Sequence, residues 1–137
     1  MDSIPQTADL RDVADARARE ARVLLGSGEY SGAYYLAGYA IECALKAVLT
    51  SSITPYAMPN KSAVGDAYTH DLEKLAAQAG LSAELNADPD VAASWLAARS
   101  WTVDSRYELH TERDANDMVE ACLGDEGGVY QWLSARW

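Results

Sequence analysis

The sequence predicts an all-α protein: an up-and-down bundle of four to five helices followed by a short C-terminal helix. Alanine, the residue that best favours helices, is abundant, and β-branched residues are sparse and rarely alternate with polar ones. Phenylalanine is absent, so tyrosine and tryptophan supply the aromatic bulk. Apolar residues over 30–50 recur with the period of a helix. The length of 137 residues predicts a single domain, spanning 1–137.

The first predicted helix begins after Thr7, the expected N-cap, and carries Asp9 in its first turn. The segment GSGE at 26–29 ends it with a glycine cap and a short turn. A loop this short predicts that the second helix runs back antiparallel to the first. The apolar stripe of the first helix is formed by Leu10, Val13, Ala14, Ala21, Leu24 and Leu25.

The second predicted helix, 30–50, has the clearest pattern in the chain. A helix that is apolar on most sides is either the central helix of a bundle or half of an oligomer interface. Gly38 lowers its stability by about 1 kcal/mol relative to alanine, and a close crossing by another helix is the expected compensation. The helical repeat consists of Ala33, Leu36, Ala37, Ala40, Ile41, Ala44, Leu45 and Val48, and Tyr34, Tyr35, Tyr39 and Cys43 extend it.

The remaining helices are shorter. Prolines and a glycine predict a long loop over 51–68, after which Thr69 is the expected cap of a third helix. Asp88 followed by Pro89 predicts the N-cap and first residue of a fourth helix. The predicted boundaries are 69–80 for the third helix, 89–100 for the fourth, Arg106 or Thr111 to Leu123 for the fifth, and 129–137 for the last.

The charge balance limits the classes of partner. The net charge is −10 and the isoelectric point is about 4.4. Nucleic-acid-binding proteins are normally basic, because neutralising phosphates supplies much of their affinity. The sequence therefore predicts no broad DNA-binding surface, although a small basic pocket stays possible. The acidity fits either a basic partner or plain solubility.

The N-terminal residues and the apolar runs predict a soluble, cytoplasmic protein. The first residues, MDSIPQTADLRD, are acidic and polar, which is unlike a signal peptide. The longest apolar run, 32–49, contains Glu42 and Lys46 and is shorter than a bilayer span. No membrane association is expected.

No cofactor or metal is predicted. Cys43 and Cys122 both fall within helical apolar patterns and are interpreted as buried free thiols. The chain has two histidines and no Cys/His cluster, so a dedicated transition-metal site is not expected. Nucleotide-binding loops, the GxSxG elbow and the HExxH motif are absent from the sequence.

Glu42 is a carboxylate within the most apolar helix, where an unpaired charge is costly. Lys46, one turn later, is its expected partner. Two interpretations are open. The residues form a local ion pair at the edge of the core, or Glu42 lies in a polar groove and holds a cation or a backbone amide from another helix.

His70 and Asp71 follow the expected cap of the third helix, where Asp71 complements the helix dipole. His70 either makes a tertiary hydrogen bond that supports this helix start or contributes to a site shared with Glu42.

Trp101, Arg106 and Tyr107 gather between the fourth and fifth predicted helices. They form either an inward-facing arginine–aromatic corner that locks the turn or a contact for a ligand or RNA, since arginine grips phosphate and aromatic rings stack on bases. His110 lies four residues after Arg106, so on a helix both side chains would face the same way. Taken alone, His110 is equally interpreted as a surface residue.

Four segments in order resemble the HEPN superfamily of small α-helical bundles. They are ARVLLGSGEYSGAYYLAGYAIECALKAVL, THDLEKLAAQAGL, the W…SRY corner and VYQWL. The resemblance is most specific over Ala21–Val48, which is similar to that family's second-helix signature A-Y-x-L-A-x-x-A-x-E-x-x-L-K-A. It implies a HEPN-like bundle that usually dimerises, and the tyrosine-rich side of the second helix is the candidate interface.

The resemblance implies two kinds of function. One branch of the family consists of metal-independent ribonucleases, often toxins of toxin–antitoxin pairs, with an arginine, a polar residue and then a histidine. The other branch lacks that motif and is thought to bind nucleotides or to partner a minimal nucleotidyltransferase. Here only three residues separate Arg106 from His110, fewer than in the ribonucleases, and Tyr107 stands where asparagine or aspartate is usual.

We therefore expect a non-catalytic HEPN-type binding or accessory module. It would bind a nucleotide or RNA, or partner a minimal nucleotidyltransferase. The first alternative is a metal-independent endoribonuclease, a toxin that uses Arg106 and His110 as catalytic candidates. The second is a structural, scaffolding dimer. The expected ligand-binding groove is lined by Glu42, Lys46, His70, Arg106 and Tyr107.

Overall fold

The computed structural model describes residues 7–51 and 69–137, and every regular element within them is helical. This confirms the predicted all-α class. The predicted loop over 51–68 falls almost entirely outside the described residues, as does the side chain of Thr7. The elements are α1 (Thr7–Gly26), α2 (Tyr30–Ser51), α4 (Leu72–Gln78), α5 (Ser82–Ala87), α6 (Ala92–Ala98), the 3₁₀ helix η1 (Val103–Tyr107), α7 (Glu112–Leu123) and α8 (Val129–Ser134).

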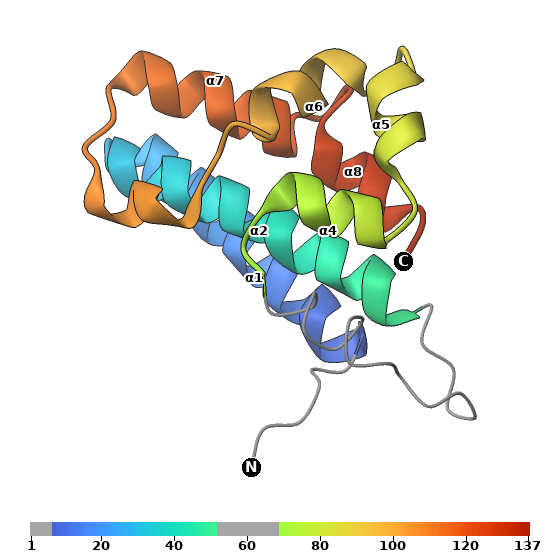
Figure 1. Cartoon of the computed structure of the whole chain (residues 1–137). Coiled ribbons are helices and arrows are strands. Elements are labelled where there is room, and N and C mark those ends of the chain that lie inside the picture. The colour runs from blue at the N-terminus through green and yellow to red at the C-terminus, as the bar shows by residue number, and fades with distance from the viewer. Residues whose placement is uncertain (1–6, 52–68) are drawn as a thin grey trace.

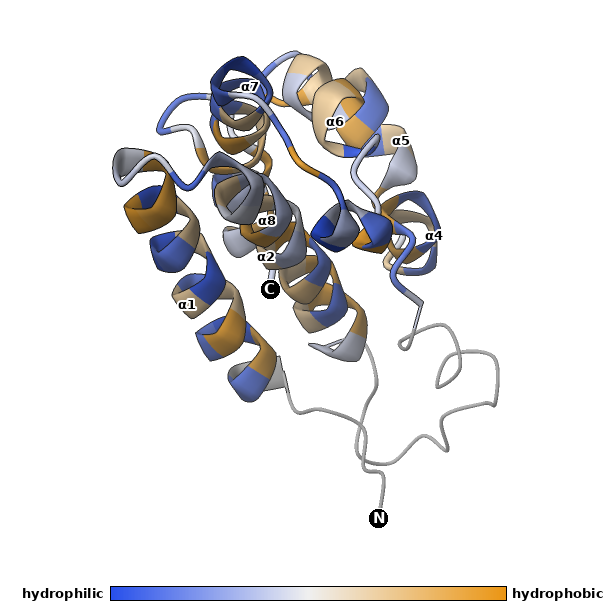
Figure 2. Ribbon diagram, turned by 90° about the vertical axis from the view of Figure 1, so that its left-hand side faces the viewer, coloured by the Kyte–Doolittle hydropathy of each residue, from blue (hydrophilic) through white to orange (hydrophobic). Residues whose placement is uncertain are grey.

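The helices α1 and α2 form a long antiparallel hairpin, as the short GSGE turn predicts (Figure 1). The turn closes through a hydrogen bond from the amide of Glu29 to the carbonyl of Leu24 at 2.9 Å. Gly28 has a φ of 81°, a conformation that glycine adopts without strain. Along α1, hydrophilic and hydrophobic bands alternate, as expected for a helix with one face on the bundle (Figure 2).

Helix α2 is the centre of the fold. It packs against α1, α4, α7, α8 and η1 (Figure 1). Its alanines from residue 33 to residue 47, together with Ile41 and Leu45, are buried. The interpretation of this segment as the central helix of a bundle is therefore confirmed. Cys43 and Cys122 are buried free thiols, as predicted.

Gly38 is the point of closest approach, but the neighbour is a side chain and not another helix. A Cβ atom at this position would overlap the indole ring of Trp101. Trp101 is 2% exposed and comes from the connection between α6 and η1. The helix crossing expected at Gly38 is therefore replaced by a tryptophan ring that packs on the bare backbone of α2.

Two predicted caps are wrong. The N-cap of α4 is Asp71, whose carboxylate accepts from the amide of Lys74 at 3.0 Å, while Thr69 lies two residues earlier. Asp88 ends α5, a helix that the sequence did not predict, and α6 begins only at Ala92. The carboxylate of Asp88 instead accepts from the amide of Asp90 at 2.9 Å, which closes a turn before α6.

Helix α7 begins at the second of its two predicted starts, Thr111, and not at Arg106. Thr111 is the N-cap of α7 and accepts from the amide of Asp114 at 3.1 Å. Arg22 on α1 donates a 3.0 Å hydrogen bond to the carbonyl of Leu123, the last residue of α7. This bond satisfies a carbonyl that a helix end leaves without an intrahelical partner. In the described ranges, no helix has the length and apolar character needed to cross a membrane.

Candidate functional site

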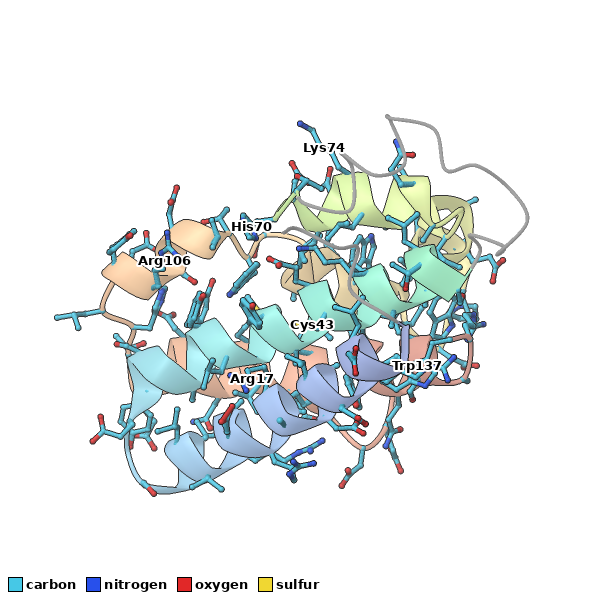
Figure 3. The ribbon with its side chains drawn as sticks, turned by 90° about the horizontal axis from the view of Figure 1, so that it is seen from below. Arg17, Cys43, His70, Lys74, Arg106 and Trp137 are labelled. Carbon is cyan, nitrogen blue, oxygen red and sulfur yellow. The ribbon has the colours of Figure 1, made fainter. Side chains whose placement is uncertain are left out.

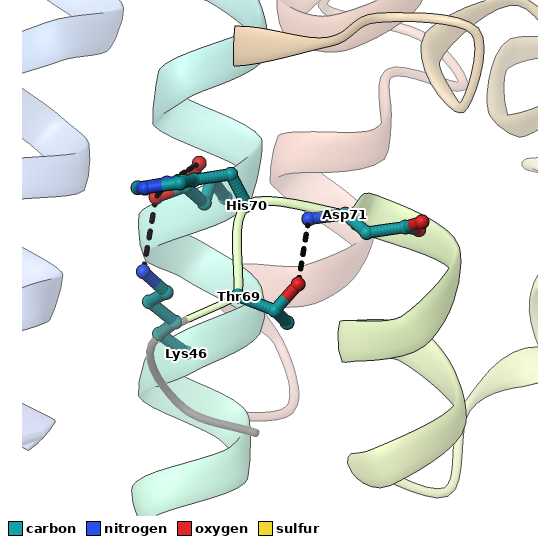
Figure 4. Close-up of polar contacts among 5 residues, drawn as sticks. Lys46, Thr69, His70 and Asp71 are labelled. Atoms are coloured by element: carbon teal, nitrogen blue, oxygen red, sulfur yellow. Dashed lines mark hydrogen bonds and ion pairs between the residues drawn. The ribbon is translucent and has the colours of Figure 1, made fainter. Parts of the chain in front are cut away.

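Glu42 is the one charged residue among the buried residues of α2 in the described structure, with an exposed fraction of 2%. Nδ1 of His70 lies 3.0 Å from both of its carboxylate oxygens. Nζ of Lys46 lies 3.0 Å from Oε2 of the same carboxylate. Figure 4 shows both partners reaching the carboxylate, His70 from the start of α4 and Lys46 from the next turn of α2. The three residues form a cluster, named here the Glu42 cluster.

The chain around His70 is fixed by two local hydrogen bonds. The amide of Asp71 donates to Oγ1 of Thr69 at 3.2 Å (Figure 4). The carboxylate of Asp71 then caps α4 by accepting from the amide of Lys74. These bonds set the direction in which the chain enters α4, and that direction places His70 over Glu42. The capping sequence and the tertiary contact therefore support each other.

The ion pair of Glu42 with Lys46 favours one tautomer of His70 in the cluster. A carboxylate that also pairs with Lys46 acts as an acceptor, so Nδ1 of His70 carries the hydrogen that it donates. Nε2 of neutral His70 is then a hydrogen-bond acceptor, and in the imidazolium form it becomes a donor. A buried carboxylate is costly unless it is paired and hydrogen-bonded. Glu42 meets this condition with two partners.

An open groove adjoins the cluster between the start of α4 and the chain that leaves α6. Its volume is about 500 Å³. His70 belongs to both the cluster and the groove. The other residues that line the groove are Thr69, Asp71, Leu72, Glu73, Arg99, Trp101, Thr102 and Val103.

Trp101 lines this groove, and the pyrrole edge of its ring rests on Gly38 of α2. The ring is stacked near Tyr35, with centroids 5.9 Å apart and planes at 29°. Its indole N–H is buried on the side of α2 and has no hydrogen-bond partner within the described residues. A buried donor without a partner costs about 1–3 kcal/mol.

Arg106 and Tyr107 do not join the groove. Tyr107 is 77% exposed and Arg106 is also exposed, with its guanidinium carbon 4.9 Å from the centroid of the Tyr107 ring. The expectation of an inward-facing corner is therefore wrong for these two residues, although Trp101 does face inward. The reason is the 3₁₀ turn of η1, which buries Ser105 and directs the next two side chains outward.

Arg106 and His110 do not share a helix. Glu108 ends η1 with φ −113° and ψ 151°, and Thr111 has φ −76° and ψ 166°. The chain between them is extended, so the expectation that both side chains lie on one helical face is wrong. The interpretation of His110 as a surface residue is also wrong, because its side chain is only 14% exposed.

His110 is held as a packing residue. Its ring stacks on Tyr34 with centroids 3.7 Å apart and planes at 9°. Its backbone amide donates to Oγ of Ser31 at 2.8 Å. A second pocket of about 360 Å³ lies beside this stack, and Arg106 is not among its lining residues. The ring of His110 thus packs against the first turns of α2, whereas Arg106 lies exposed over Tyr107.

Burial keeps the other potentially reactive groups protonated. It raises the pKa of the Cys43 thiol to about 12, with a smaller contribution in the same direction from Glu42. Burial also raises the pKa of Tyr34, and Glu108 raises it further. The pKa of Tyr39 is raised first by burial and then by Cys43. None of these groups is a ready nucleophile at neutral pH. Among the described residues, no group of three or more His, Cys, Asp or Glu side chains could hold a metal ion.

Sequence reasoning missed several residues of the groove, among them one arginine and one threonine. Arg99 and Thr102 flank Trp101 and line the groove with it. Arg99 is the C-cap of α6, a helix whose start was predicted too early. The sequence feature that could have identified them is their position within two residues of Trp101. A tryptophan that is buried in the core holds its neighbours in the chain at the same place on the surface.

A family model described as "HEPN domain" matches residues 7–136 of the chain. No curated protein and no solved structure gave a match.

Proposed function

The chain belongs to the HEPN domain family, and from this membership we propose that it is a non-catalytic binding module of that family. The ligand is a nucleotide or the end of an RNA strand. It binds in the groove beside the Glu42 cluster. Of the expected groove residues, His70 lines the groove, while Glu42 and Lys46 lie beside it in the cluster that holds the His70 ring. Arg99 and Trp101 take the place of Arg106 and Tyr107.

The observation that carries the proposal is the position of His70. A buried cluster holds the ring at one nitrogen, and the same residue lines a groove of about 500 Å³. Sites for small ligands and cofactors typically have volumes of about 300–1,000 Å³. A side chain fixed by hydrogen bonds to a packed helix loses little freedom when a ligand arrives. The net charge of −10 favours a ligand with few phosphates over a long nucleic acid.

The geometry of Arg106 and His110 supports the absence of catalysis. Proton transfer needs a group within hydrogen-bond reach of the reacting atom, and a misplacement of about 1 Å can cost roughly a hundredfold in rate. Arg106 lies exposed over Tyr107, whereas His110 is stacked on Tyr34. The two groups have different neighbours, and Arg106 does not line the pocket beside His110.

The module would act as a homodimer, with a minimal nucleotidyltransferase as its candidate partner. The supporting observation is the outer side of α2. Tyr35 and Tyr39 remain partly exposed there, with ring centroids 5.9 Å apart, although most of the helix is buried. Tyrosine is enriched at protein interfaces because one end of the ring is apolar and the other end is polar. Size-exclusion chromatography with light scattering tests the dimer, and a Tyr39→Glu variant should be monomeric.

Binding is tested by isothermal titration calorimetry and thermal shift with nucleosides and their phosphates. The wild-type protein should bind at least one of them, and His70→Ala should weaken binding at least about tenfold, the effect of roughly 1.4 kcal/mol. Arg113→Ala, on the exposed face of α7, is the matched control and should bind as the wild type does. A protein that binds none of these ligands and captures no nucleotidyltransferase on co-expression would contradict the proposal.

The two alternatives make different predictions. A ribonuclease toxin would slow growth on expression and cleave RNA, and His110→Ala would abolish both effects. A scaffold would lose stability but no binding property when His70 or Arg99 is changed. The ribonuclease alternative is excluded if cells that express wild type and His110→Ala grow equally and neither protein cleaves RNA.

A further inference from the structure

We propose that the groove beside the Glu42 cluster receives the nucleoside part of its ligand and leaves the phosphates outside. This inference rests on the proposed function in its nucleotide form. It adds which half of the nucleotide is recognised. The argument comes from the charges and hydrogen-bonding groups on the walls of the groove.

The charges on the walls do not favour an anion. Asp71 and Glu73 line one side, and Arg99 is the only arginine or lysine among the lining residues of the described groove. Nε of Arg99 lies 3.6 Å from Oε1 of Glu73, and one terminal nitrogen of the same guanidinium donates to Oδ1 of Asn86 at 3.2 Å. The positive charge of Arg99 is thus already engaged. A phosphate entering here would meet two carboxylates and a guanidinium that has protein partners.

The start of α4 is closed to phosphate as well. Backbone amides in the first turn of a helix commonly bind anions. Here the carboxylate of Asp71 already accepts from the amide of Lys74. A phosphate would have to displace a side chain of the same charge. The local cap therefore excludes the usual mode of phosphate binding.

The remaining charged groups nearby do not reverse this balance. Glu42 and Lys46 of α2 pair with each other, so their charges cancel. Lys74 of α4 does not line the groove and points away from the bundle (Figure 3). With a neutral His70, the walls carry two carboxylates, Asp71 and Glu73, against the single guanidinium of Arg99.

The same walls suit an uncharged, polar and partly flat ligand. The indole of Trp101 forms part of the groove wall. The hydroxyl groups of Thr69 and Thr102 both donate and accept. Leu72 and Val103 add apolar surface. A nucleoside combines acceptors on its base, hydroxyl donors on its ribose and an apolar ring face, so its groups complement those of the groove.

The test is calorimetry of the full chain with a nucleoside, its monophosphate and its triphosphate, at pH 8 and constant ionic strength. The nucleoside should bind at least as tightly as the triphosphate, and its affinity should change little with salt. Asp71→Asn keeps the ability to cap α4 and removes one charge. In this variant the ratio of triphosphate affinity to nucleoside affinity should rise about fivefold, the effect of removing a repulsion of roughly 1 kcal/mol between the carboxylate and the phosphates.

Glu112→Gln, at the start of α7, is the matched control, because it removes the same charge from an exposed position that does not line the groove. It should leave all three affinities unchanged. A triphosphate that binds the wild type ten times more tightly than the nucleoside overturns the inference and leaves the binding function standing. Failure of all three ligands to bind overturns the inference together with the nucleotide-binding function.

Discussion

Nδ1 of His70 is equidistant, at 3.0 Å, from the two carboxylate oxygens of Glu42. The contact joins residues 28 positions apart in the chain and links the start of α4 to the middle of α2. It is therefore a tertiary bond as well as part of the candidate site, and its two ends should respond differently to substitution.

Glu42→Ala should destabilise the protein by about 3 kcal/mol, because removing one member of a buried charge pair leaves the other without its counter-charge. Lys46 is the residue left in that state. His70→Ala should cost only about 1 kcal/mol, since half of the His70 side chain is exposed and Lys46 still pairs with Glu42. Urea unfolding at neutral pH measures both values. Equal effects of the two variants would contradict the unequal burial on which this prediction rests.

Gly38→Ala should destabilise the protein by about 1–3 kcal/mol, although alanine is the better helix former. The added methyl group overlaps the ring of Trp101, which is itself too deeply buried to move aside easily. Gly26→Ala is the control, because a Cβ atom there has no neighbour within 4 Å. Thermal denaturation of the two variants should show opposite or clearly different shifts. A neutral Gly38→Ala variant would mean that the tryptophan does not rest on the helix.

His110→Ala should lower stability by about 0.5–1.5 kcal/mol, the usual contribution of an aromatic pair beyond the area that it buries. The lost interaction is the parallel stack on Tyr34. Leu109→Ala is the control, since this neighbouring side chain is 95% exposed and should contribute almost nothing. Chemical denaturation of both variants checks the difference. If His110→Ala is as stable as the wild type, the ring of His110 does not have the packing role assigned to it here.

Asp88 should stabilise the protein at neutral pH and lose this effect in acid. The indole N–H of Trp132 donates to Oδ2 of Asp88 at 2.9 Å and holds the pKa of this carboxyl below its usual value, with help from the amide of Asp90. A folded pKa below the unfolded value means that the stabilisation is complete above about pH 4, the ordinary range for aspartate. It is lost as the pH falls through the folded pKa.

The measurement is urea unfolding of wild type and Asp88→Asn at pH 7 and again below pH 4. The wild type should be the more stable protein at pH 7, and the difference should shrink in acid. Trp132→Phe removes the main donor and should reduce the same pH dependence. A difference between wild type and Asp88→Asn that grows on acidification would contradict the direction of the shift.

The parts of the fold that sequence predicts are those set by near neighbours. The apolar period of α2 and the GSGE turn follow from local spacing, and so does the pairing of Glu42 with Lys46 one turn away. The caps of α4 and α6 were misplaced because several residues competed for each position. Thr69 and Asp71 both suit an N-cap, and only the tertiary position of His70 favours the second.

The candidate site was predictable only in part, because its walls come from segments far apart in the chain. A site shared by Glu42 and His70 was one of two interpretations of the sequence, and their contact follows only from the path that the chain takes into α4. Arg106 attracted attention through its spacing to His110, but an extended segment between them removes the helical geometry on which that spacing depended. Arg99 carried no motif, and its role follows from the folded position of Trp101.

The hydrogen bond from Arg22 to the carbonyl of Leu123 spans 101 positions of sequence. During synthesis, the hairpin of α1 and α2 emerges from the ribosome long before the residue that anchors its first helix. Until Leu123 is available, the buried alanine faces of the hairpin have only part of their final covering. Non-local contacts of this kind slow folding, because the chain must close a long loop first. The hairpin is thus fully covered only once α7 and α8 have docked, and its buried faces are open to premature association until then.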